Sequence, residues 1–400
     1  NLSGDFGKSN FYNMQGEILR QGKNTIRKMN AMYHLNVAEL PNIMADIDFS
    51  GPLFTILKQA EFNEGDVEVD YRNWINFNQP EEEKAWGKIK LKNVSVRHLS
   101  GFQPLRKLIG GISFGDGHIS LNKIGGWYGS SPIRVDGQLT PKSKSLVNFD
   151  LHASSTDWAQ ADFKDIPRLK NLKFMGPISA QITLSGDHNS FRFKNKLDLT
   201  RVSYKFQNDI HKKKNLTNRI EMAGVYSEKK GIVVNQWSFV LDGSSVTGKA
   251  RVKSFADPEY SIKINAKGLK TNAVASVIDV LKNNQDGTID FNVSGRGNLD
   301  RVEDSLFEGS AVLRGLVFKW EDRKNPLALS ADVKFLGNTY DFRLGQMKSG
   351  RSQLTFSGIY KDREHPSLVL NLTGKALAID ELVRDKTDDD EIEITFKDIL

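Results

Sequence analysis

The chain has no cysteine, only 11 prolines in 400 residues, and no apolar run approaching 18 residues. The absence of cysteine excludes disulfide frameworks, thiolate nucleophiles and cysteine-based zinc or iron–sulfur sites. With 38% apolar and 26% charged residues, the composition is that of a folded chain and not of a disordered or collagen-like one. Without a long apolar run, we expect neither a signal peptide nor a membrane-spanning helix in this sequence.

Motifs of catalysis and cofactor binding are also missing. The seven histidines form no HExxH pair, and the sequence contains no GxSxG elbow, Walker A loop or complete GxGxxG motif. The acidic run 388–391 lacks the alternation and the glycine of a calcium loop. We therefore expect no enzymatic activity, no metal site and no cofactor.

The net charge is +7, but the basic residues are scattered. The one basic block, 211–214, and the acidic run 388–391 are both typical of solvated loops. We expect no nucleic-acid partner.

Apolar and polar residues alternate with a period of two in segment after segment, which is the pattern of a β-strand with one buried face. The clearest segments are 178–184, 260–266, 289–293 and 368–372. Turn signals such as Asp116-Gly117, Asp242-Gly243, Asp286-Gly287 and Gly337-Asn338 stand between segments. The pattern predicts about 20 strands, mostly antiparallel because the connections are short.

A longer repeat underlies this alternation. Segments 132–139, 245–252 and 354–360 resemble one another, and their glycines, Gly137, Gly248 and Gly358, stand about 110 residues apart. Each glycine is followed by a polar turn, an alternating strand and a helix-like stretch, at 157–163, 272–281 and 377–383. Only 272–281 has the full apolar spacing of an amphipathic helix.

This order predicts repeat units in series. We expect a degenerate unit at 1–110, a partial unit at 111–171, a unit with a short helix at 172–284, a unit at 285–384, and an acidic loop with the start of a further strand at 385–400.

An antiparallel sheet of about 20 strands, with one apolar and one polar face, can close into a barrel, stack as sandwiches or curl into a trough. The repeated helix-like piece favours the trough, so the predicted fold is mainly β: an elongated, curled antiparallel repeat sheet with a few short helices and an open hydrophobic groove. An apolar surface of that size is expected to be used, and an acyl chain is its natural occupant. The predicted lining residues are Phe149, Leu151, Ile178, Ile182, Leu184, Ile262, Ile264, Ile289, Phe291, Val293, Val333, Phe335, Leu368, Leu370 and Leu372.

The segments 245–252 and 258–269, followed by the amphipathic stretch 272–281, resemble the AsmA-like superfamily, which includes the YhdP and TamB types. Segments 366–374 and 377–383 resemble the same element, and the likeness extends over residues 86–384. The resemblance implies a periplasmic protein, anchored to the inner membrane by an N-terminal helix outside this sequence, that conducts phospholipid toward the outer membrane. It implies no catalytic residues.

Two other functions fit the alternation. Tandem β-sandwiches would make the chain a structural or adhesive surface protein. An open sheet edge could instead pair with unfolded β-segments during assembly of outer-membrane proteins.

Overall fold

The computed structural model describes residues 2–40, 60–98, 103–142, 147–159, 173–206, 210–254, 256–278, 281–320, 325–362, 365–376 and 378. In this part the chain is nearly all antiparallel β-structure, with 21 strands in a large open sheet and three short strands in a small one. The predicted fold class, mainly β with few helices, is confirmed. The acidic run 388–391, residues 160–163 of the helix-like stretch 157–163, and all of the stretch 377–383 except residue 378 lie outside the described residues, whereas residues 157–158 belong to a strand.

The chain divides into two compact units, which are described separately. Unit 1 comprises Asn1–Gln207, Lys212–Phe239 and Lys249–Ala256, and unit 2 comprises Asn208–His211, Val240–Gly248 and Asp257–Leu400. The repeat units expected from the 110-residue spacing stay a prediction.

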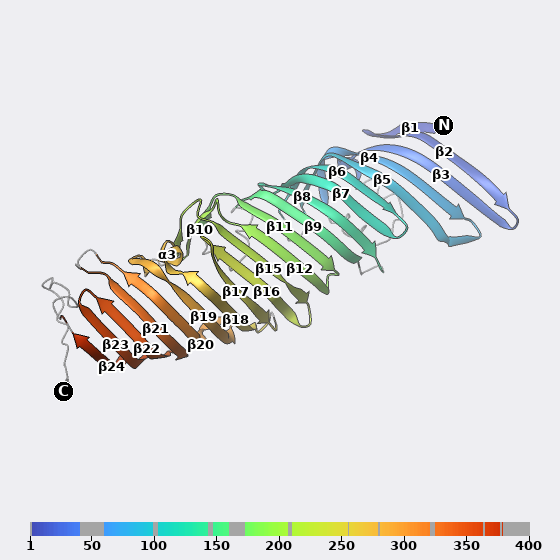
Figure 1. Ribbon diagram of the computed structural model, residues 1–400. Coiled ribbons are helices and arrows are strands. Elements are labelled where there is room, and N and C mark those ends of the chain that lie inside the picture. Colours follow the sequence, from blue (N-terminus) through green and yellow to red (C-terminus); the bar gives the residue numbers. More distant parts are fainter. Residues whose placement is uncertain are drawn as a thin grey trace. The chain divides into compact units, whose positions relative to one another are not determined.

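Unit 1 is a ladder of neighbouring strands that follow one another in sequence order (Figure 1). Its strands up to β15 are β1 (Leu2–Phe6), β2 (Ser9–Gln21), β3 (Asn24–Asn36), β4 (Glu61–Asn76), β5 (Gln79–His98), β6 (Leu105–Gly115), β7 (His118–Tyr128), β8 (Ser131–Pro141), β9 (Val147–Trp158), β10 (Lys173–Met175), β11 (Ile178–Gly186), β12 (Ser190–Asp198), β13 (Ser203–Phe206) and β15 (Asn218–Ser227). Each long strand pairs antiparallel with the next, and only the short β10 and β13 leave this order to pair with each other. In the described part of unit 1, the long strands from β1 to β15 therefore form one continuous sheet.

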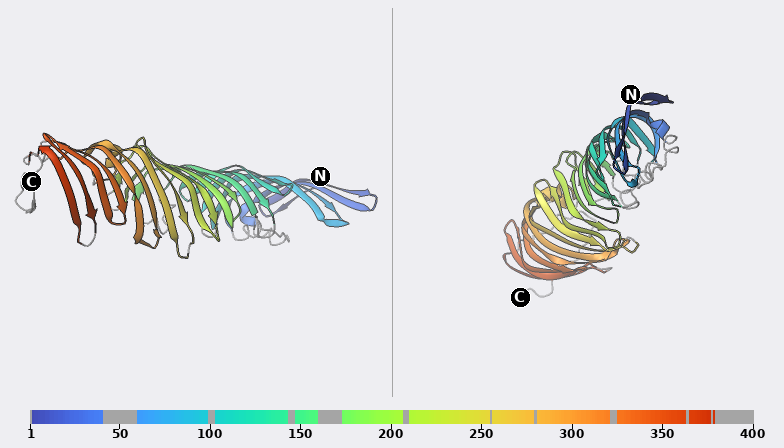
Figure 2. Two further views of the ribbon diagram at one scale, coloured as in Figure 1. Left: turned by 60° about the horizontal axis from the view of Figure 1, so that its bottom comes forward. Right: turned by 90° about the vertical axis from the view of Figure 1, so that its right-hand side faces the viewer.

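Unit 2 repeats this arrangement. Its strands from β18 onward are β18 (Glu259–Lys270), β19 (Asn284–Asn298), β20 (Arg301–Phe318), β21 (Leu327–Leu336), β22 (Thr339–Ser349), β23 (Ser352–Lys361) and β24 (Ser367–Ala376). Figure 2 shows these strands, coloured orange to red, to be bowed along their length. The remaining strands of the chain are β14 (Ile210–Lys212), β16 (Gly231–Leu241) and β17 (Ser244–Val252).

Helices are few and short in the described residues. The 3-10 helix η1 (Val37–Glu39) follows β3, and α3 (Thr271–Ala275) follows β18. The prediction of a helix over 272–281 is therefore wrong in length. Lys270 offers no side-chain cap, and the Ser276 hydroxyl donates back to the Ala273 carbonyl oxygen at 2.6 Å, where the helix ends.

Turn signals predicted three of four turns. Asp116-Gly117, Asp242-Gly243 and Gly337-Asn338 each form a turn, whereas Asp286-Gly287 lies inside β19. Gly287 has φ +123°, and a β-carbon there would lie 2.7 Å from the Leu316 Cα of the next strand. Glycine is required here because the backbones of the two strands are too close for a side chain, and not because the position is in a hairpin turn.

β-Bulges recur across both units. In unit 1 the register shifts at Asn93, Lys107 and Lys123, and each of these residues has positive φ. In unit 2 it shifts at Gly268 and Gly315, which also have positive φ. A bulge of this kind bends its strand and increases its twist. The repeated bulges account for the bowed strands.

Candidate functional site

The strand register places the apolar residues of unit 1 on one face, here called the apolar face, in rows that cross the strands. One row joins eight consecutive ladder partners from β4 to β12 and continues into β15. Its members are Val69, Ile89, Ile112, Leu121, Gly137, Leu151, Leu184, Phe193 and Gly224. No step of this row changes face, so the surface is continuous across these strands.

Unit 2 carries the same kind of surface. One of its rows runs from β18 to β24 without changing face: Ala266, Phe291, Ala311, Val333, Phe342, Gly358 and Leu370. Most of its side chains are half-buried, whereas Leu368, Leu370 and Leu372 of β24 are 56%, 40% and 55% exposed. Apolar side chains are therefore accessible on this face of unit 2.

All fifteen predicted lining residues lie on the apolar face of their unit. Phe149, Leu151, Ile178, Ile182 and Leu184 belong to unit 1, and the other ten to unit 2. Ile178 and Val333 are buried, with 7% and 8% of their surface exposed, and Ile178 packs in a cluster with Phe174 and Val202. These two side chains pack against protein and are not part of an open surface.

Glycines on the apolar face lie beside large side chains of the neighbouring strand. A β-carbon at Gly295 would lie 2.5 Å from Phe307 Cε1, and one at Gly345 would lie 2.5 Å from the Phe356 ring. The rings therefore lie over the glycines. This arrangement covers the glycine backbone and keeps the rings low on the sheet.

The opposite face is charged. Cross-strand ion pairs follow it, including Glu68 with Lys92, and Lys196 with Glu221 at 3.1 Å between Nζ and Oε1. Each such exposed pair contributes about 0–1 kcal/mol. Their main effect is to keep this face in water.

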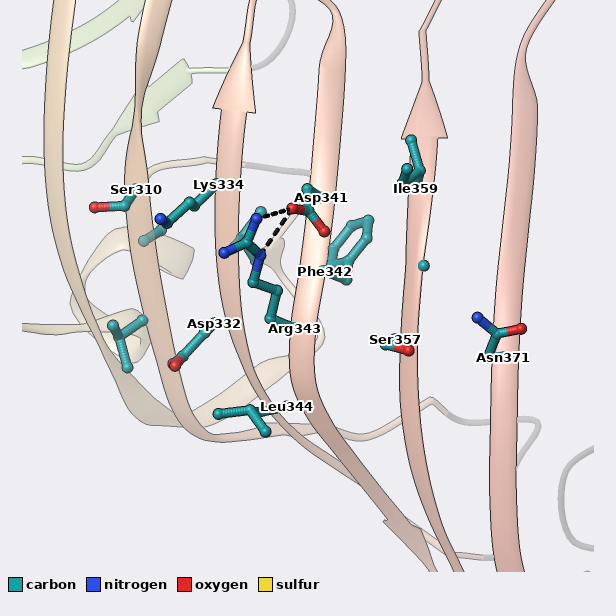
Figure 3. Close-up of a pocket in the computed structure, with 14 residues that line it drawn as sticks. Ser310, Asp332, Lys334, Asp341, Phe342, Arg343, Leu344, Ser357, Ile359 and Asn371 are labelled. Atoms are coloured by element: carbon teal, nitrogen blue, oxygen red, sulfur yellow. Dashed lines mark hydrogen bonds and ion pairs between the residues drawn. The ribbon is translucent and has the colours of Figure 1, made fainter.

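An open hollow of about 690 Å³ lies over β20 to β24 of unit 2 (Figure 3). It is lined mainly by side chains of the charged face, among them Asp332, Lys334 and Asn371. The Arg343 Nη2 lies 2.6 Å from the Asp341 Oδ2, so these two charges pair with each other. Of the predicted lining residues, Val333 alone also lines this hollow.

The bulges are held by side chains of the adjacent strand. The Lys123 N–H donates to Asp136 Oδ1 at 2.7 Å, and the Gly315 N–H donates to Ser330 Oγ at 2.9 Å. Asp290 accepts from the Gly268 N–H at 2.6 Å and pairs with Arg314. These two donors hold the pKa of Asp290 below its usual value. This set of residues was not predicted from the sequence.

Lys212 overturns the prediction that 211–214 is a solvated loop. It is only 2% exposed, and its Nζ donates to the carbonyl oxygens of Leu199, Val202 and Thr200 at 2.9, 2.5 and 3.2 Å. Burial lowers the pKa of Lys212, opposed by the charge of Asp198. This lysine holds the segment between β12 and β13 in place.

Among the described residues, no three histidine or acidic side chains are close enough to hold a metal ion. No helix in the same part of the chain is long and apolar enough to span a membrane. The chain matches no protein-family model, no curated protein and no solved structure.

Proposed function

We propose that the chain is a lipid-transport protein that holds acyl chains on its apolar face. The observation that carries this proposal is the unbroken apolar register, which extends over the nine-member row of unit 1 and the seven-member row of unit 2. An apolar surface of this extent is uncommon on a protein unless a ligand or partner covers it.

The energetics suit transport. Each buried methylene stabilises a bound acyl chain by about 0.8 kcal/mol relative to water. A surface as apolar as a membrane interior lets lipid pass between the two at little net cost. No reacting group is needed, and many weak sites conduct better than one tight site.

The resemblance to the AsmA-like superfamily supplies the setting of the proposal. It supports a periplasmic location, anchorage to the inner membrane by a segment outside this sequence, and phospholipid as the cargo moved toward the outer membrane. We propose that the protein performs no chemistry on that cargo.

The experiment is lipid mass spectrometry of the full chain, purified without added lipid. We expect co-purified phospholipid, and we expect Ile264→Asp to reduce it several-fold because a carboxylate on the apolar face repels acyl chains. Thermal stability should change less, since the new charge can meet water from the open side of the sheet.

Lys263→Asp is the matched control, because Lys263 is exposed on the charged face of the same strand. It should leave the lipid content unchanged. Lipid-free wild-type protein would contradict the proposal, as would equal loss of lipid in both variants.

A further inference from the structure

Aromatic side chains concentrate at one edge of the apolar face in unit 1. The edge is where the short connections 77–78, 116–117, 187–189 and 228–230 join the strands, and we call it the turn edge. A row close to it contains Tyr71, Gly87, Phe114, Ile119, Leu139, Phe149, Gly186, Phe191 and Tyr226. We call this the aromatic row.

The rings of this row touch. The ring centres of Phe149 and Phe191 are 5.9 Å apart, those of Phe191 and Tyr226 are 4.7 Å apart, and Tyr71 lies 6.4 Å from Phe114. All five side chains are half-buried. They form an aromatic border beside the turns.

Farther from the turn edge, the apolar face becomes aliphatic. The row four residues along each strand contains Val135, Ala153, Ile182, Asn195 and Met222, with no aromatic member. From β4 to β15 the intervening row has one aromatic ring, Phe193, which lies over Gly224; beyond Val69 it continues to Tyr33 and Phe11 of β3 and β2. We call the row from Val135 to Met222 the aliphatic row.

Unit 2 shows the same gradient in its tyrosines. Tyr340 and Tyr360 are ladder partners with ring centres 5.9 Å apart, and both lie near the connections 337–338 and 362–366. The Tyr360 hydroxyl donates to Asp362 at 3.4 Å. The aromatic residues in the two rows farther from this edge are all phenylalanines: Phe291, Phe342 and Phe356.

The opposite edge of unit 1 is covered. Val37 of η1 is fully buried against Val94, Leu108 and Ile124. Val202 and Phe174 bury the end of β11 in the same way. The two edges therefore differ in packing: the rings of the turn edge contact one another, whereas Trp158 and Tyr204 at the other edge pack against a buried cluster.

These dimensions match one leaflet of a bilayer. A strand rises about 3.4 Å per residue, so four residues separate the aromatic and aliphatic rows by about 14 Å. One leaflet contributes about 15 Å of hydrocarbon, bordered by a belt of tyrosine and tryptophan at the polar boundary. The apolar face reproduces that order from the turn edge inward.

We propose that the aromatic row orients the bound lipid, with its glycerol and headgroup at the turn edge and its acyl chains along the strands over the aliphatic row. The inference rests on the proposed function and adds a direction to it. Amphipathic rings favour the polar boundary of the lipid. The rings at the opposite edge are instead packed against buried side chains. The headgroup would then move along the turn edge as the lipid advances.

The test uses phosphatidylglycerol with a photoreactive diazirine either beside the glycerol ester or at the end of one acyl chain. The full chain is incubated with vesicles of each probe and irradiated, and labelled residues are identified by peptide mass spectrometry. We expect the ester probe to label the aromatic row, including Phe149 and Phe191, at least threefold more than the aliphatic row. The chain-end probe should show the reverse preference, at Ala153 and Ile182.

Equal labelling of both rows by both probes, or the opposite preference, would overturn the orientation while leaving lipid binding intact. Absence of labelling anywhere on the apolar face would overturn the proposed function itself. The double variant Phe149→Leu/Phe191→Leu keeps the surface apolar and should abolish the preference. The matched variant Leu151→Met/Leu184→Met should retain it, and a loss of preference in both variants would contradict a specific role of the rings.

Discussion

At individual strand positions, the residue type that the fold requires depends more on the neighbouring strand than on the residue's own β-propensity. Gly137 has φ +149°, and a β-carbon there would lie 2.1 Å from the Asp150 carbonyl oxygen. Gly125, one strand away, has nothing closer than 3.8 Å to the same added atom. Both glycines stand in strands, yet only the first is required by a close backbone approach.

We therefore expect Gly137→Ala to destabilise the protein by about 1–3 kcal/mol, because the backbones of β8 and β9 must separate. Gly125→Ala should change stability by no more than about 1 kcal/mol, and in the stabilising direction. Denaturant unfolding of both variants measures the difference. Similar changes in the free energy of unfolding for the two variants would show that the close backbone approach at Gly137 does not affect stability.

For Lys212 too, the structural surroundings differ from what the sequence suggests: the basic run predicts an exposed side chain, but the side chain is buried. Lys212→Met should lower the free energy of unfolding by about 1–3 kcal/mol, because the carbonyl oxygens that accept from Nζ lose their donor. Lys213→Met, at an exposed neighbour, should cost less than about 0.5 kcal/mol. Thermal denaturation of the two variants is the measurement, and an unaffected Lys212→Met protein would rule out a structural role.

At the scale of strands, alternation predicted the faces but not the bulges. Where a bulge occurs, the apolar spacing lengthens from two residues to three, as from Leu121 to Ile124 and from Leu313 to Leu316. The residue at the bulge can be a lysine or asparagine, so composition gives no warning. The three-residue apolar spacing could have predicted where the bulges lie. The side chains that cap the freed N–H groups come from other strands, so they can be identified only once the strand register is known.

Asp290 makes this arrangement sensitive to pH. Its pKa is lowered in the folded protein, so between the folded and unfolded pKa values the unfolded chain binds more protons. The contribution of Asp290 to stability is complete above its unfolded pKa, near 4, and is lost as the pH falls through the lower folded value.

Asp290→Asn should therefore reduce the loss of stability below about pH 4, because the amide cannot titrate. Its oxygen can still accept from the Gly268 N–H, so the bulge should persist. Unfolding free energies measured from pH 2 to pH 7 test this. Asp341→Asn is the control, since Asp341 is paired with Arg343 within one strand and caps no bulge. Parallel pH profiles for Asp290→Asn and the wild type would contradict the account.

For the molecule as a whole, the sequence predicted the antiparallel β class and the set of residues on the apolar face. Strict period-2 alternation carries that information, because each second residue shares a face. The helix after β18 was predicted too long, because Lys270 does not cap it and Ser276 bonds back to Ala273 where it ends. The burial of Ile178 was not predicted, since it depends on packing with Phe174 and Val202 from other segments. The thirteen predicted lining residues other than Ile178 and Val333 are half-buried or exposed, and the proposed conduction of lipid rests on them.

The most direct test is photocrosslinking from two adjacent residues of β18 in the full chain, produced in cells. A benzophenone amino acid at Ile264 projects from the apolar face, and one at Lys263 projects from the charged face. We predict that irradiation attaches phospholipid at position 264 and not at position 263, as identified by mass spectrometry of the crosslinked peptide. Lipid at neither position, or equally at both, would contradict the claim that the apolar face holds lipid.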